Sequence, residues 1–334
     1  IIHSHAMHLF FLSLPDFFDL ENDLDFISKY KKETNCAMNL RSWGLKIVEV
    51  VGGRAVHPIA CEVGGFKVLP TRAELNNLLV QYEEAVKNSL ALINMTLKVK
   101  LPKFSRPTTF VSLKKDGEYA LYEGDLFILK SDGSSRLVPD QKFTKNIKEI
   151  EVPYRAAKSA TLDGEAFMVG ALARLNINSE FLHPLAKGIF KKLNWKLPEY
   201  NTFKNVVAQA IEILHCVEEA KILLDDLSKN LRAEDSKIKN LGLIASANPT
   251  GNDSYGADAV EAPRGTLYHS YKINKSGIIT DCQIITPTVS FLKNLEEDIA
   301  LYLPNLMKLS KKKRSLKIRS LIRAYDPCIS CATH

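Results

Sequence analysis

The chain closes on Asp326-Pro327-Cys328-Ile329-Ser330-Cys331-Ala332-Thr333-His334, and this stretch organises our interpretation of the whole sequence. Proline directly after Asp326 is typical of a helix start, because proline lacks only a donor that would be unpaired there. If a helical turn follows, Cys328, Cys331 and His334 share one face. Two adjacent soft thiolates suit nickel, iron, copper or zinc, so we expect this terminus to be buried and functional.

His334 stands apart from the two cysteines in this interpretation. Six residues separate it from Cys328, which is roughly 9 Å along a helix axis at ~1.5 Å per residue. We therefore expect His334 to bind a second ion.

Composition limits the class of protein. With 334 residues, 46% of them hydrophobic, the chain is long enough for one large domain or two intimate ones. The net charge of +7 concentrates in residues 311–323, which we interpret as a solvated helix face rather than a nucleic-acid patch, since no interleaved aromatic residues or binding motif accompany it. No apolar run approaches the ~18 residues of a membrane span. The six cysteines are unevenly placed and their one close pair has metal spacing, which indicates a reducing compartment.

Hydrophobic periodicity predicts mostly helices. We expect a buried helix over His3–Leu14 that Pro15 ends, and a long helix from Glu21 to Val51 that Gly52-Gly53 closes. The remaining expected helices are Thr71–Leu97, opened by a capping box, Asn201–Leu231, Leu292–Leu306 and Leu316–Tyr325. Histidines 3, 5 and 8 are candidate ligands, but we interpret them as core or interface residues.

Short β patterns interrupt the helices in two places. Residues 105–155 hold the runs 109–111, 119–122 and 126–129, which predict a small antiparallel insertion. Residues 259–288 predict a β hairpin whose strands, 266–273 and 278–285, join across 274–277. Between these two regions Arg174 lies in an apolar setting, where a buried arginine needs a carboxylate or carbonyl partner. The fold class is therefore mainly α with a minor β part (α+β), as one domain over 1–334 with a long-helix core.

The ligands of a metal at Cys328 and Cys331 are incomplete in this chain. The other cysteines are isolated, so a structural zinc site is unsupported, and the spacing before His334 is not that of a c-type haem. Distant cysteines, an absent segment or non-protein groups are the open alternatives. The chain opens on Ile1 without Met in the middle of an apolar pattern, so we expect it to be a fragment.

The terminal stretch 323–334, Arg-Ala-Tyr-Asp-Pro-Cys-Ile-Ser-Cys-Ala-Thr-His, closely resembles the C-terminal signature of nickel–iron hydrogenase large subunits. The run Glu-Ala-Pro-Arg-Gly-Thr-Leu at 261–267 resembles the arginine motif of that family. Segments 4–8, 52–58 and 167–170 also fit, in family order. The run Ile-Ile-Thr-Pro-Thr at 284–288 is most similar to the cytosolic sulfhydrogenase and NAD(P)-linked branch. The resemblance spans nearly the whole chain.

This resemblance implies a nickel–iron centre whose iron carries CO and CN. It gives Cys328 as a terminal nickel ligand that can accept a proton, and Cys331 as a thiolate bridging nickel and iron. Arg264 matches the guanidinium over the metal pair, where its charge can stabilise the reaction electrostatically. Asp326 matches the carboxylate paired with that arginine. The resemblance also implies that Thr288 donates to a cyanide and that Pro287 shapes the same pocket. It gives His334 as a magnesium (or iron) ligand and His57 as a residue that contacts the small subunit.

The resemblance also implies the reaction and its partners. H2 is oxidised reversibly to two protons and two electrons, which pass to a small subunit holding iron–sulfur clusters and then to NAD(P)- or other acceptor-reducing subunits, in the cytoplasm. One departure is that the family's N-terminal cysteine motif, which supplies the other ligands, is absent. The rival interpretations are a non-catalytic relative like those of respiratory complex I, a zinc-stabilised interaction module, and a fragment unable to hold the metals.

Overall fold

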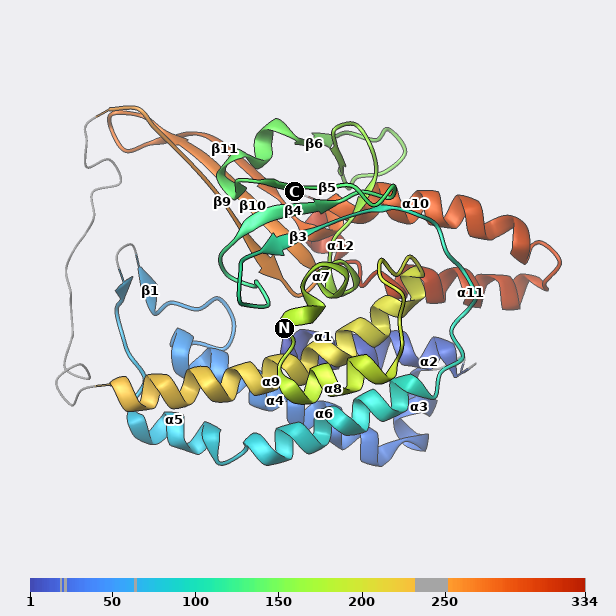
Figure 1. Cartoon of the computed structure of the whole chain (residues 1–334), viewed down its shortest axis with the longest axis horizontal. Coiled ribbons are helices and arrows are strands. Elements are labelled where there is room, and N and C mark those ends of the chain that lie inside the picture. Colours follow the sequence, from blue (N-terminus) through green and yellow to red (C-terminus); the bar gives the residue numbers. More distant parts are fainter. Residues whose placement is uncertain (19, 21–22, 63–64, 232–251, 334) are drawn as a thin grey trace.

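Helix α9 (Asn205–Asn230) lies at the centre of the computed structural model, which describes residues 1–18, 20, 23–62, 65–231 and 252–333. Nearly every side chain from Asn205 to Glu218 is buried, because α1, α5, α6, α7 and α8 all contact this helix. These helices form the lower layer in Figure 1, and small sheets cover them. One hydrophobic cluster runs through helices and sheets, so the mainly α fold with a minor β part is confirmed.

The bounds of the helices follow, with η marking a π- or 3-10 helix: α1 Ile2–Met7, η1 His8–Ser13, α2 Leu14–Phe17, α3 Asp23–Lys29, α4 Lys31–Gly52, α5 Arg72–Leu79, α6 Tyr82–Leu97, η2 Asp140–Lys145, α7 Ala171–Asn178, η3 Ser179–Phe181, α8 Pro184–Lys192, η4 Thr202–Lys204, α10 Pro287–Leu306, α11 Lys311–Ala324 and α12 Ile329–Ala332. The strands are β1 Cys61–Glu62, β2 Gly65–Phe66, β3 Thr109–Lys114, β4 Asp125–Leu129, β5 Ser135–Val138, β6 Ile147–Ile150, β7 Ser159–Leu162, β8 Phe167–Met168, β9 Ser254–Ala262, β10 Gly265–Ile273 and β11 Ile279–Ile285.

The N-terminal helix does not end where the sequence predicted. Pro15 lies in the first turn of α2 and the helical conformation continues through it to Phe17, so the prediction that it ends the helix was wrong. A π-helical stretch, η1, joins α1 to α2. His5 and His8 are buried on this segment, at 0% and 2% exposure, as expected of core residues.

Two predicted long helices are each broken into two. The first breaks at Tyr30, between α3 and α4, and ends at Gly53, which takes the left-handed conformation (φ 76°) of a C-cap. The second begins with the predicted capping box of Thr71 and Glu74, but it breaks between α5 and α6. The Leu78 carbonyl near that break accepts the Trp43 indole N–H at 3.1 Å, a tertiary contact that periodicity cannot reveal.

The first β region is more complex than an antiparallel insertion. Its main sheet has the order β5-β4-β3-β8, and β8 pairs with β3 in parallel, so this sheet extends beyond the predicted 105–155. Residues 119–122 form no strand. Tyr119 instead points into the helical layer, where its hydroxyl donates to Glu212 Oε1 at 2.6 Å.

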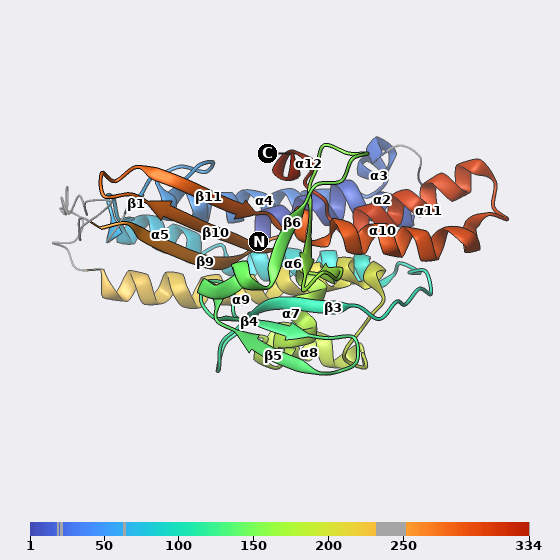
Figure 2. The same ribbon diagram turned by 90° about the horizontal axis from the view of Figure 1, so that it is seen from above.

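The second β region contains one more strand than the predicted hairpin. Strands β10 and β11 pair antiparallel as expected, but β9 pairs on the other side of β10, and it begins at Ser254 rather than at 259. Pro287 and Thr288 belong to the first turn of α10. This sheet extends to one end of the long axis and the α10–α11 pair to the other (Figure 2).

The C-terminal segment crosses back over the core. Asp326 has φ 57°, and helix α12 begins only at Ile329, so the prediction that Asp326-Pro327 starts a helix was wrong. Tyr325 anchors the segment, because its buried hydroxyl donates to Asp298 Oδ2 at 2.6 Å and accepts from Asn294 Nδ2 at 2.8 Å. Among the described helices, none combines the length and apolar character needed to cross a membrane.

Candidate functional site

The two C-terminal cysteines lie beside the N-terminal turn of α10. The backbone N–H of Cys328 donates to Thr288 Oγ1 at 3.0 Å, and that of Cys331 donates to the Cys328 carbonyl at 3.1 Å. The two sulfur atoms are paired as a disulfide, with the Cα atoms 5.4 Å apart. Both side chains therefore converge on one place, and reduction gives two adjacent thiols there.

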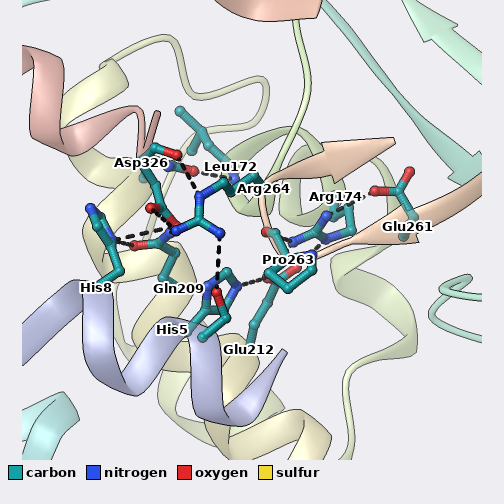
Figure 3. A network of polar contacts seen from close by, with 12 residues as sticks. His5, His8, Leu172, Arg174, Gln209, Glu212, Glu261, Pro263, Arg264 and Asp326 are labelled. Carbon is teal, nitrogen blue, oxygen red and sulfur yellow. Dashed lines mark hydrogen bonds and ion pairs between the residues drawn. The ribbon is translucent and has the colours of Figure 1, made fainter. Parts of the chain in front are cut away.

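Arg264 reaches the C-terminal segment from the turn between β9 and β10. Its Nε donates to the Asp326 carbonyl at 2.9 Å, and its Nη2 lies 3.0 Å from Asp326 Oδ1 (Figure 3). A third donor, Nη1, lies 3.4 Å from the hydroxyl of Ser4 on α1. The guanidinium thus grips both the backbone and the side chain of Asp326, two residues before Cys328.

The Asp326 carboxylate is buried, at 1% exposure, and has partners on both of its oxygens. Besides Arg264 on Oδ1, Gln209 Nε2 donates to Oδ2 at 3.0 Å, and His8 Nδ1 lies 3.7 Å from the same oxygen. Gln209 Oε1 is 2.7 Å from His8 Nδ1. Because a buried carboxylate needs charge and donors around it, the helices α9 and η1 fix its orientation from below.

Arg174 has two carboxylate partners, Glu212 and Glu261, where the sequence predicted that it needs a partner. Arg174 is fully buried and lies 2.6 Å and 2.8 Å from the carboxylate oxygens of Glu212, and 2.8 Å from Glu261 Oε2 (Figure 3). Burial alone would lower the pKa of Arg174, but the charge and hydrogen bonds of Glu212 outweigh it and raise that pKa. Arg174 is therefore charged, and it has the kind of partner that the sequence predicted for a buried arginine.

The two carboxyl groups around Arg174 respond differently to burial. Burial alone would raise the pKa of Glu212, but the guanidinium outweighs it and lowers that pKa, whereas burial raises the pKa of Glu261. Burial also lowers the pKa of His5 to about 4, so its ring is neutral near pH 7. The neutral ring donates from Nε2 to Glu212 Oε2, because a carboxylate can only accept.

The structure thus brings together Arg264, Asp326, Thr288, Cys328 and Cys331 from the candidate residues of the sequence. Pro287 lies beside them as the first residue of α10. His57 is exposed in the loop between α4 and β1, with a left-handed backbone (φ 53°) held by Arg54, whose Nε donates to its carbonyl. His334 lies outside the described residues.

Sequence analysis missed the polar residues of α9 at this site. Gln209 and Glu212 interrupt a long apolar run (Val206, Val207, Ala208, Ala210, Ile211, Ile213, Leu214). Both are buried, at 1% and 0% exposure. A polar residue inside a run that is apolar all round is a signal of a buried partner, and it was available in the sequence.

The donor set can be tested against the chemistry of a nickel–iron centre. Two soft sulfur donors from one short segment fit such metals, and the Arg264 guanidinium beside Asp326 supplies fixed positive charge. In the part of the chain that the structure describes, no three His, Cys, Asp or Glu side chains form a metal-binding cluster. Cys328 and Cys331 therefore supply two of the ligands of such a centre, and its other protein ligands are not found among the described residues.

Comparison with known proteins adds independent observations. A family model described as nickel-dependent hydrogenase matches residues 111–334. The chain is 33% identical to sulfhydrogenase 1 subunit alpha of Pyrococcus furiosus, over all of this chain and 75% of that one. It is 26% identical to the NAD-reducing hydrogenase HoxS subunit beta of Cupriavidus necator, over all of this chain and 73% of that one.

Among solved structures, a crystal structure of an NAD+-reducing [NiFe]-hydrogenase in the H2-reduced state superposes with a TM-score of 0.84. Its sequence identity is 24%, and the match covers all of this chain and 77% of the other. At that identity the superposition establishes the fold, and the family rests on the sequence matches.

Proposed function

This chain belongs to the nickel-dependent hydrogenase family, as the catalytic large subunit of a nickel–iron hydrogenase, and from that premise we propose how its residues act. The bound nickel–iron centre supplies the chemistry that converts H2 into two protons and two electrons. The observation that carries the proposal is the convergence of Cys328 and Cys331 beside the Arg264–Asp326 pair.

Cys328 and Cys331 hold the centre as thiolates. A thiolate on a metal is deprotonated at neutral pH, so Cys328 Sγ would be able to hold a proton from hydrogen when the centre is bound. Cys331 would supply a second thiolate, which the two metals would share. The two remaining protein ligands are assigned to no residue of this chain, because among the described residues none of Cys36, Cys61, Cys216 and Cys282 belongs to a metal-binding group.

Four side chains would act around the metals without binding them. Arg264 would stabilise negative charge at the bound centre and donate to a cyanide of its iron, while Asp326 holds the guanidinium in place. Thr288 accepts from the Cys328 N–H through its oxygen, which leaves its own proton to donate to the other cyanide. Pro287 shapes that pocket, and His334 binds a magnesium or iron ion.

The electrons leave through a partner. The described residues bring no cluster of cysteines together, so we propose an iron–sulfur small subunit, followed by NAD(P)- or other acceptor-reducing subunits, in the cytoplasm. The proposed contact includes His57, whose exposed ring stands in a loop with other exposed side chains, Val56 at 62% and Ile59 at 57%. Exposed apolar side chains close together are typical of a surface that a partner covers.

Elemental analysis of the intact, anaerobically purified protein tests the metal proposal. We expect one nickel and one iron at this centre in preparations that turn over hydrogen, because two thiolates select soft metals. Active preparations with iron but no nickel contradict the proposal. Zinc as the sole metal favours a zinc-stabilised module instead.

Co-purification tests the partner proposal. We expect the large subunit to be isolated with an iron–sulfur subunit, and a photoreactive cross-linker at position 57 to capture it. The same cross-linker at Tyr154, an exposed residue between β6 and β7, is the matched control and should capture none. A stable, monodisperse large subunit that evolves hydrogen from a soluble electron donor alone rules the partner out.

A further inference from the structure

The turn that carries Arg264 is held by hydrogen bonds from another element of the fold. Arg174 on α7 donates from Nη1 to the Ala262 carbonyl at 3.0 Å and from Nη2 to the Pro263 carbonyl at 2.9 Å. Pro263 is the residue directly before Arg264. The direction in which the Arg264 side chain leaves the backbone is therefore set by two hydrogen bonds from another element.

Close backbone packing holds the same turn on its other side. A Cβ on Gly265 would lie 2.4 Å from Val169 Cγ2, and a Cβ on Gly170 would lie 2.9 Å from the Arg264 carbonyl oxygen. Gly170 has φ 105°, which favours glycine. The connection between β8 and α7 thus touches the turn so closely that neither glycine has room for a side chain.

Arg174 spends all five of its donors within this assembly. Two N–H groups donate to the turn carbonyls, two donate to Glu212 and one donates to Glu261. The two hydrogens of Nη1 go to Glu261 and to the Ala262 carbonyl. Glu212 is itself fixed by the Tyr119 hydroxyl at 2.6 Å and by His5 at 2.9 Å. Glu261 accepts the Leu113 backbone N–H at 2.9 Å and the Thr266 hydroxyl at 2.8 Å. Arg174 therefore has no donor left for a ligand, and it can affect the site only through what it holds.

A need for stability alone does not explain this arrangement. A buried ion-pair cluster is weak evidence for stability, because well-packed apolar residues of similar volume often do as well. The guanidinium fork differs from apolar packing in that it fixes two carboxylates and two carbonyls in one geometry. What that geometry fixes here is the position of Arg264.

We propose that Arg174 is a positioning residue for Arg264, which holds the Ala262–Gly265 turn so that the Arg264 guanidinium meets Asp326 above the two cysteines. This proposal rests on the proposed function where it is tested by hydrogen turnover. A crystal structure of the variant tests it without that assumption. In a crystal structure of the Arg174→Lys variant, the Arg264 Nη2–Asp326 Oδ1 separation of 3.0 Å should be lost. An unchanged turn and an unchanged separation overturn the proposal.

Kinetics distinguish positioning from a general structural role. We expect Arg174→Lys to keep its nickel and iron and to lose ~10-fold to 100-fold in hydrogen turnover, the range typical of residues that orient a site. In the double variant with Arg264→Lys, the Arg174→Lys change should cost nothing more, because the residue that it positions is already disabled. Losses that multiply show that Arg174 acts independently of Arg264 and contradict the proposal.

Further variants separate the role of Arg174 from general damage to the fold and from a failure of the proposed function. Arg155→Lys changes another arginine with a carboxylate partner, Glu296, and should leave turnover unchanged. If Arg174→Lys does not fold, Gly170→Ala displaces the turn from its other side while all Arg174 partners remain, and it should show the same lack of additivity with Arg264→Lys. If the wild-type protein lacks nickel and turnover, the proposed function fails, whereas the crystal structure of the variant still decides the role of Arg174.

Discussion

Replacement of Cys328 by serine should remove hydrogen turnover completely and lower nickel content to background. A serine hydroxyl stays protonated at neutral pH, and its oxygen is a hard donor that nickel disfavours against a thiolate. The serine also cannot accept a proton as the sulfur does. Nickel per polypeptide, measured by elemental analysis, and hydrogen uptake on the intact enzyme check both expectations.

Cys282→Ser is the matched control for that change. Cys282 is an exposed cysteine on β11, so its replacement should leave both metal content and turnover at the wild-type level. A Cys328→Ser enzyme with normal nickel and normal turnover would show that this sulfur is no ligand. Loss of nickel in both variants would point to general damage rather than to a site at Cys328.

The parts of the site that are local in sequence could be predicted. The spacing of Cys328 and Cys331 predicted that both sulfurs lie on one side of the chain, and the two sulfurs are paired in the structure. The apolar setting of Arg174 predicted a carboxylate or carbonyl partner, since a buried guanidinium without one is costly, and the structure supplies both kinds. Each of these expectations follows from a few neighbouring residues and one physical rule.

The parts that depend on distant residues could not be predicted in the same way. Nothing local joins Arg264 to Asp326, which lie 62 positions apart, or Arg174 to the turn at Ala262 and Pro263. A distant contact also lies at the break between α5 and α6, where the Leu78 carbonyl accepts the indole N–H of Trp43, 35 residues away. Tertiary contacts override the local pattern at these places.

One local rule gave the wrong answer at the site itself. Asp before Pro reads as an N-cap, but Asp326 takes a left-handed conformation (φ 57°) and turns the chain before α12. Its carboxylate, which would have capped a helix, is bound by Arg264 and Gln209 instead. The departure from helix chemistry therefore occurs where the residue is used for the site, as is expected of functional positions.

Arg264→Lys should cut hydrogen turnover by ~10²–10³-fold, the usual cost of losing one electrostatic donor at a reaction centre. The guanidinium holds Asp326 at two points, its carbonyl by Nε and its carboxylate by Nη2, and remains 27% exposed for further contacts. A lysine ammonium is a single nitrogen, so it cannot bind both groups and still face the metals. Turnover at saturating hydrogen, with nickel and iron content measured on the same preparations, checks this prediction.

Two results decide what Arg264 does. Nickel and iron should stay at wild-type levels, because the thiolates remain, and Arg136→Lys, a change in an exposed ion pair on β5, should alter neither metals nor turnover. A loss smaller than ~10²-fold would mean that Arg264 only pairs locally and closes the turn, since a donor at the reacting centre costs at least that much. A loss of metal together with turnover would instead place Arg264 among the residues that assemble the centre, and its electrostatic role would fall.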